Sequence, residues 1–326
     1  MSKRIVNISS LLGFILLLSG CGQETSLTPL PHNGEQEPVE IHLNASLAQI
    51  SVDVTRANTT MPMPDNSSIG LYGTRNADDM PGSSPYIDNW EFVTDVQGIM
   101  KSTENAKVYF PAGREQAFLY AYSPYTTSVK VMADGNVGIP VKSGDDLLYA
   151  YDNPTIVRNG STETEATPSG TATLAFKHAM AKLNVLVSTS ATETYSLNAI
   201  TITFSNGQSG YMNLSDGKVT SETSSDKTIT QSYDPAGTIS NATDLQAQFS
   251  STVIPPSTVT GNAIQEIRIT VDDTEYIVYE ATSGPAITLT AGSQKTLRIN
   301  FNLNNQANAS LIDWGSDANQ DIDYNK

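Results

Sequence analysis

The stretch Val39–Leu47, VEIHLNASL, is the part of this chain from which the fold is most directly argued. Apolar residues occupy every second position, and polar residues fill the positions between them. Side chains on a β-strand point alternately to opposite faces, so this period of two predicts a strand with one buried face and one polar face. The alternation then changes parity at Ile50, Val52 and Val54, which predicts a bulge or a turn at Ala48-Gln49.

The same type of signal recurs along the chain, with short apolar segments between turn-forming residues. Asn206-Gly207, Asp216-Gly217 and Asp272-Asp273 predict tight turns, and residues 133–136 predict a hairpin loop. Strands are predicted near residues 69–72, 90–93, 108–111, 118–122, 129–131, 137–139, 147–150, 199–204, 210–214, 248–254, 264–271, 276–279, 287–289 and 296–303. Many short strands with turns between them favour an all-β protein built from β-sandwiches.

Two regions are less regular. Residues 174–187 have a first half that is compatible with a helix and a second half that alternates as a strand, and the Ser/Thr-rich residues 221–245 are expected to form a long loop. The polar stretch 153–170 precedes a sharp recovery of apolar residues, so we place a domain boundary at its end. The predicted domains are residues 39–170 and 171–326.

The N-terminus resembles that of a bacterial lipoprotein. Lys3 and Arg4 precede a mainly apolar stretch, which ends in Leu18-Ser19-Gly20-Cys21. Residues 1–20 therefore read as a signal peptide, because the apolar stretch is short for a membrane span. The resemblance to a lipobox predicts cleavage before Cys21, the only cysteine, and attachment of acyl chains such as palmitate to it. Gly22 rather than Asp follows, which by lipoprotein sorting rules suggests the outer membrane, and the proline-containing residues 21–38 form a tether.

Composition and motifs argue against several classes of function. The formal net charge of −16 would repel phosphate backbones, so no nucleic acid partner is expected. The chain lacks the common motifs of metalloproteases, serine hydrolases and phosphate-binding loops. Of its three histidines, His32 lies in the tether and His42 on the polar face of the first strand. His178, in an apolar segment, is interpreted as structural. No enzymatic activity, metal or cofactor is predicted, although a glycosidase-like pair of carboxylates stays open, and the acidic residues 317–323 read as a solvated tail.

Several segments in order resemble the fimbrillin-like family of lipoprotein pilins from Bacteroidales, over most of the chain from about residue 21 onward. They are the lipobox, the sequence VTRA at 54–57, IGLY at 69–72, VYFP at 108–111, FLYAYSPY at 118–125, LAFKHAMAKL at 174–183, LTAGSQK at 289–295 and IDW at 312–314. None is decisive alone, because each is a fragment of a strand. Their ordered combination carries the resemblance.

The resemblance implies two transthyretin-like Greek-key β-sandwich domains in tandem and export as a lipoprotein. It also implies cleavage by an arginine-specific protease between Arg56 and Ala57, removal of the strand at residues 39–54, and assembly with other fimbrial subunits by strand exchange. A strand from another subunit would fill the groove, where it satisfies free backbone groups and apolar pockets.

Two functions are compatible with these observations. The first is a structural subunit, or an anchor or tip component, of a cell-surface fimbria that contributes to adhesion to host or bacterial surfaces. The alternative is a monomeric surface lipoprotein that binds a glycan or a host ligand. The two differ in whether the protein polymerises once residues 39–54 have been removed.

Overall fold

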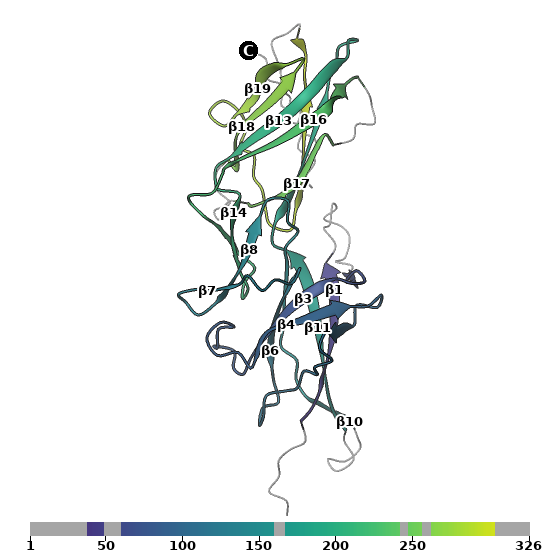
Figure 1. The fold of residues 1–326 in the computed structure, drawn as a ribbon, viewed down its shortest axis with the longest axis vertical. Coiled ribbons are helices and arrows are strands. Elements are labelled where there is room, and N and C mark those ends of the chain that lie inside the picture. The colour runs from purple at the N-terminus through teal and green to yellow at the C-terminus, as the bar shows by residue number, and fades with distance from the viewer. Residues whose placement is uncertain (1–37, 49–59, 160–166, 242–246, 256–261, 304–326) are drawn as a thin grey trace, which may run out of the picture. The chain divides into compact units, whose positions relative to one another are not determined.

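The computed structural model describes residues 38–48, 60–159, 167–241, 247–255 and 262–303. In this described part of the chain the regular elements are the strands β1 to β20, and there is no α-helix (Figure 1). Accordingly, these residues contain no helix that could cross a membrane. The prediction of an all-β fold is confirmed.

The largest sheet has nine strands in the order β2-β1-β11-β9-β6-β3-β4-β5, with β10 paired to β11. Strand β1 runs parallel to β11, and the other neighbouring strands are antiparallel. The strands are β1 (Ile41–Ala48), β2 (Thr60–Pro62), β3 (Ser68–Thr74), β4 (Ile87–Thr94), β5 (Met100–Ser102), β6 (Phe118–Ser123), β9 (Leu148–Asp152), β10 (Val157–Asn159) and β11 (Thr167–His178).

This sheet is buried on both faces at its centre. All six residues of β6 are buried, and consecutive residues of β3 and β6 belong to different cores. Leu71 and Leu119 pack into the first core, whereas Tyr72, Tyr120 and Tyr122 pack into the second core on the opposite face. Two apolar faces explain why β6 reads as a continuous apolar run rather than as an alternation. Tyr120 and Tyr122 are therefore packing residues and do not form an exposed aromatic surface.

The second core joins the large sheet to a four-stranded sheet in the order β15-β14-β8-β7. Val137, Ile139, Met212 and Leu214 are its main contributors from this sheet and the turn that follows β14. The predicted hairpin at residues 129–139 is confirmed, because Lys130 pairs with Gly138 across it. The strands are β7 (Lys130–Val131), β8 (Val137–Lys142), β14 (Ser209–Asn213) and β15 (Val219–Ser221).

The remaining strands form two sheets that share a third core. One sheet has the order β17-β12-β20, and the other has the order β16-β13-β18-β19. The largest side chains of this core include Phe204, Phe249 and Phe301. The strands are β12 (Ala181–Ser188), β13 (Tyr195–Phe204), β16 (Thr228–Ile239), β17 (Phe249–Val253), β18 (Ile264–Val271), β19 (Thr274–Glu280) and β20 (Gln294–Asn300).

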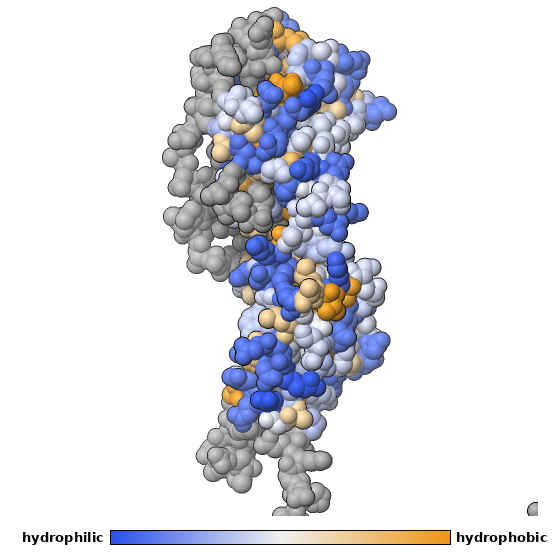
Figure 2. Space-filling view, turned by 90° about the vertical axis from the view of Figure 1, so that its left-hand side faces the viewer, coloured by the Kyte–Doolittle hydropathy of each residue, from blue (hydrophilic) through white to orange (hydrophobic). Residues whose placement is uncertain are grey.

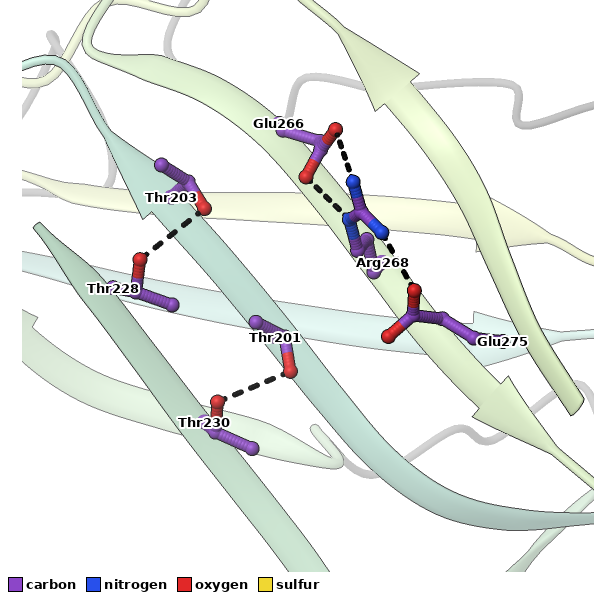
Figure 3. Close-up of polar contacts among 7 residues, drawn as sticks. All are labelled: Thr201, Thr203, Thr228, Thr230, Glu266, Arg268 and Glu275. Atoms are coloured by element: carbon purple, nitrogen blue, oxygen red, sulfur yellow. Dashed lines mark hydrogen bonds and ion pairs between the residues drawn. The ribbon is translucent and has the colours of Figure 1, made fainter. Parts of the chain in front are cut away.

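Two sequence-based expectations were wrong. The first half of residues 174–187 is not helical, since it forms the end of β11 and the tight connection to β12. Residues 221–245 are not one long loop, because β16 pairs with β13 within them. Strand β16 is rich in polar residues such as threonine, so it shows no apolar alternation. Threonine nevertheless favours strands, and threonines on neighbouring strands hydrogen-bond to each other. The hydroxyls of Thr201 and Thr230 lie 3.1 Å apart, and those of Thr203 and Thr228 lie 3.4 Å apart (Figure 3).

Two predicted strands are irregular segments whose apolar side chains are nevertheless buried. Within residues 108–111 only Tyr109 forms a bridge, to Glu40, while Val108 and Phe110 are 3% and 6% exposed. Ile287 and Leu289 are buried without belonging to a strand. The predicted turn at Asp272-Asp273 is confirmed, because both residues have positive φ angles and connect β18 to β19.

Two pairs of strands in the described chain are parallel, and all other pairs are antiparallel. Strand β1 runs parallel to β11, and β12, the next strand along the chain, runs parallel to β20. Gly170, where we placed the domain boundary, lies within β11. The division into residues 39–170 and 171–326 stays a prediction, and this repeated pairing is compatible with two similar units.

The face drawn in Figure 2 is mostly hydrophilic, and its apolar residues lie in small, separate patches. Among the described residues, Val96 and Val131 are the most exposed large apolar residues, at 67% and 61%. Isolated exposed apolar residues are normal on a soluble surface. This face therefore offers no broad apolar docking surface.

Candidate functional site: the seat of strand β1

Strand β1 is the first strand of the described chain. On its C-terminal side it is connected to β2 through residues 49–59. The predicted cleavage site at Arg56-Ala57, the shifted strand at residues 50–54 and the lipidation site Cys21 all lie outside the described residues. One cut within residues 49–59 would leave β1 held by non-covalent contacts alone.

The backbone of β1 is paired on both edges. On one edge, residues Ile41–Leu47 pair in parallel with Gly170–Phe176 of β11. On the other edge, the amide of Ile41 donates to the carbonyl of Val108 at 2.8 Å, and the amide of Ala45 donates to that of Gly98 at 2.7 Å. The amide of Phe110 in turn donates to the carbonyl of Val39 at 3.0 Å. We call these partners the β1 seat: residues 170–176, strand β2, Gly98-Ile99 and residues 108–110.

The side chains of β1 confirm the predicted alternation. Ile41, Leu43 and Ala45 are 3%, 5% and 3% exposed and belong to the first core, while His42 between them is exposed. Full burial of an isoleucine or leucine side chain contributes about 1.5–3 kcal/mol. Strand β1 therefore fills apolar space as well as completing a sheet.

A charged pair fastens the N-terminal end of β1. The ammonium of Lys107 lies 2.6 Å from a carboxylate oxygen of Glu40, and this hydrogen bond raises the pKa of Lys107. Both side chains are partly exposed, so solvent screens the pair and its contribution to stability is small.

Gly98 is required by the close approach of β1. Its φ angle of +78° lies in the left-handed region, and a Cβ there would meet the carbonyl oxygen of Ala45 at 2.3 Å. Backbone atoms cannot move aside as a side chain can. The sequence alone did not reveal this residue, since the glycine that follows Asp95-Val96-Gln97 looks like an ordinary turn glycine.

We expect Gly98→Ala to loosen β1 in its seat. The substitution adds the cost of a left-handed alanine, about 1–2 kcal/mol, to the steric clash with Ala45, for a total loss of about 3 kcal/mol in the free energy of unfolding. Urea denaturation measures the loss. Gly113→Ala is the control, because its φ is also positive, at +70°, and nothing lies within 4 Å of the added Cβ. Equal losses in the two variants would contradict a steric role for Ala45.

Of the other residues considered from sequence, His178 lies within the described part of the chain and contacts one carboxylate. The Nδ1 atom of His178 lies 2.6 Å from a carboxylate oxygen of Asp146, and the histidine side chain is 15% exposed. Among the described residues no group of three or more His, Cys, Asp or Glu side chains is placed to hold a metal ion. His178 is thus half-buried and held by one carboxylate.

Comparison with known proteins now bears on this arrangement. The sequence profile of the fimbrillin-like family matches residues 55–314. The chain belongs to the fimbrillin-like family. Membership supports a role as a fimbrial component at the cell surface and a structural rather than an enzymatic function. No curated protein matches the chain in sequence.

Solved structures share the fold of this fimbrillin-like protein. A candidate cell adhesion protein from Bacteroides uniformis superposes with a TM-score of 0.54 at 17% identity, covering 85% of this chain and 99% of that one. Another from Bacteroides ovatus gives a TM-score of 0.56 at 13% identity, covering 87% and 100%. At such low identity the likeness concerns the fold alone, and it confirms a β-sandwich architecture.

Proposed function

We propose that this fimbrillin-like protein is a structural subunit, or an anchor or tip component, of a surface fimbria that assembles by strand exchange. It is exported as a lipoprotein and held in the outer membrane through acyl chains on Cys21. Cleavage between Arg56 and Ala57 then releases β1, and a strand of another fimbrial subunit takes its place. Assembly presents the protein for adhesion to host or bacterial surfaces.

The observation that carries this proposal is the β1 seat. Removal of β1 would expose the edge of β11 from Gly170 to Phe176, together with the apolar space that Ile41 and Leu43 occupy. An open strand edge beside apolar pockets is the arrangement that accepts an incoming strand, because main-chain hydrogen bonds supply affinity and the pockets supply specificity. Leaving such an edge open to water is unfavourable, which drives replacement of the lost strand.

The proposal also fits the connection between β1 and β2, which is formed by residues 49–59. A cut at Arg56 falls within this link, after β1 and before β2, so the seat itself stays intact. A cut inside β1 would leave part of that strand behind, and a cut inside β2 would remove part of the seat. The position of Arg56 is therefore suited to removing one whole strand.

Arginine-specific proteolysis tests the proposal. We expect the protein to yield a new N-terminus at Ala57, detected by N-terminal sequencing, and to form oligomers on size-exclusion chromatography. The control is Arg56→Gln, which should resist this cut and stay monomeric, while cleavage at other arginines is identified by the same sequencing. A product that begins at Ala57 and stays monomeric after loss of β1 would contradict strand exchange and favour a monomeric ligand-binding lipoprotein.

A further inference from the structure

A pocket of about 310 Å³ lies beside the β1 seat, between the start of β4 and the segment 107–112. Its volume is within the range of small-ligand sites. The residues that matter for recognition are Arg75, Tyr86, Trp90, Lys107, Tyr109 and Phe110. We call it the Arg75 pocket.

The charge of the Arg75 pocket is opposite to that of the chain. The chain has a net charge of −16, yet the described lining of this pocket includes Arg75 and Lys107 and no carboxylate. Glu40, which is paired with Lys107, lies outside the lining, so Arg75 is the cation without a carboxylate partner here. Arg75 also lines a neighbouring depression of about 420 Å³, whose lining includes both Arg114 and Glu115. Distant surface charges are screened over about 8 Å at physiological salt, so an anion in the pocket responds mainly to these nearby cations.

Arg75 is available to bind an anion. Among the described residues it forms no ion pair, and its guanidinium lies 5.6 Å from the centre of the Tyr86 ring. Arg268 shows the opposite situation, because its guanidinium is held between the carboxylates of Glu266 and Glu275 (Figure 3). A planar guanidinium without a carboxylate partner has free donors for a bidentate interaction.

Aromatic groups supply the second recognition element. Trp90 and Tyr109 line the pocket and are 36% and 38% exposed, which is high for large aromatic side chains. The Tyr86 hydroxyl is buried without a hydrogen-bond partner in the described structure. Burial raises the pKa of Tyr86, so the phenol stays protonated. A buried hydroxyl without a partner leaves one polar group of the pocket wall unsatisfied in this arrangement.

We propose that the Arg75 pocket binds a pyranose that carries a carboxylate, as in a hexuronic acid. The carboxylate pairs with Arg75, and the C–H face of the ring packs on Trp90 or Tyr109. A neutral sugar would leave Arg75 unpaired, and a simple carboxylate would leave the aromatic faces uncovered. The pocket exists with β1 seated, so this inference does not depend on strand exchange.

Glu40, the residue before β1, modulates this pocket through Lys107. In this structure the carboxylate of Glu40 pairs with the ammonium of Lys107, with 2.6 Å between oxygen and nitrogen. Loss of that carboxylate would free a second cation for the ligand. We therefore expect Glu40→Gln to bind the acidic sugar about two- to fivefold more tightly, a modest gain because Lys107 is exposed. A gain in affinity cannot arise from misfolding.

Tryptophan fluorescence of the full chain tests the proposal. The chain has two tryptophans, so Trp314→Phe leaves Trp90 as the reporter. The probes are methyl β-glucuronide, methyl β-glucoside, which lacks the carboxylate, and sodium acetate, which lacks the ring, all at equal ionic strength. We expect saturable quenching by the glucuronide alone, and at least about tenfold weaker binding after Arg75→Gln.

Arg268→Gln is the control for the loss of an arginine elsewhere, and we expect it to leave the affinity unchanged. Equal responses to the glucuronide and the glucoside would overturn the proposal, as would acetate binding as tightly as the glucuronide. An unchanged affinity in both Arg75→Gln and Glu40→Gln would overturn it as well.

Discussion

Replacing Leu43 by aspartate is expected to expel β1 from its seat. The side chain is 5% exposed and packs into the first core, so the substitution would place a carboxylate in apolar surroundings. Burying an unpaired charge is so unfavourable that the strand should leave instead. The cost is then limited to the free energy with which β1 docks, and we expect a loss of about 4 kcal/mol in the free energy of unfolding.

Hydrogen exchange and limited proteolysis measure this release directly. We expect the amides of Ile41 and Ala45, which donate to Val108 and Gly98, to lose protection in Leu43→Asp, while those of β12 keep it. The control is His42→Asp, which adds a carboxylate on the exposed face of the same strand. If the β1 amides keep their protection in Leu43→Asp, or lose it equally in both variants, burial of the apolar face does not hold β1 in its seat.

The second large effect is expected for Phe301→Ala, at the end of the third core. Phe301 is fully buried, and its ring meets those of Tyr195 and Tyr276 edge-on at 5.4 and 5.1 Å between ring centres. Large-to-small substitution of a buried phenylalanine costs about 3–5 kcal/mol, because it removes apolar burial and leaves a cavity. Urea denaturation, followed by the fluorescence of tyrosine and tryptophan, measures the loss.

Leu303→Ala is the control for Phe301→Ala. Leu303 lies two residues further along the chain and is 42% exposed, so its truncation should cost less than about 1 kcal/mol. The contrast would define where the packed part of the described chain ends. A loss in Phe301→Ala no larger than that in Leu303→Ala would show that the contacts of Phe301 with the two tyrosines do not hold β20 in place.

The elements predicted well are those whose burial pattern is local. Strands β1 and β18 alternate because each has one buried face, and a period of two reveals this without knowledge of their partners. Strand β16 was missed because its threonines and serines pair across the sheet rather than burying apolar faces. The helical alternative near residue 176 failed because pairing with β1 outweighs intrinsic propensity.

The candidate site was predicted in part. Residues 39–47 and their two faces follow from the sequence, and the described strand β1 matches them. The seat did not follow, because Gly98, Val108 and Phe110 are distant in sequence and Gly98 resembles any turn glycine. The Arg75 pocket was likewise invisible, since nothing in the sequence separates an arginine without a partner from one held by two glutamates.

By itself, the sequence determined that this fimbrillin-like protein is all-β, and it placed most strands and the faces that they bury. These properties depend on residues that are neighbours in the chain, so the spacing of apolar residues along the sequence is enough to predict them. Only the tertiary structure decided that β1 lies parallel to β11, with Ile41 opposite Gly170. The register of distant strands depends on which faces and backbone edges meet in three dimensions, and a local pattern is compatible with many partners.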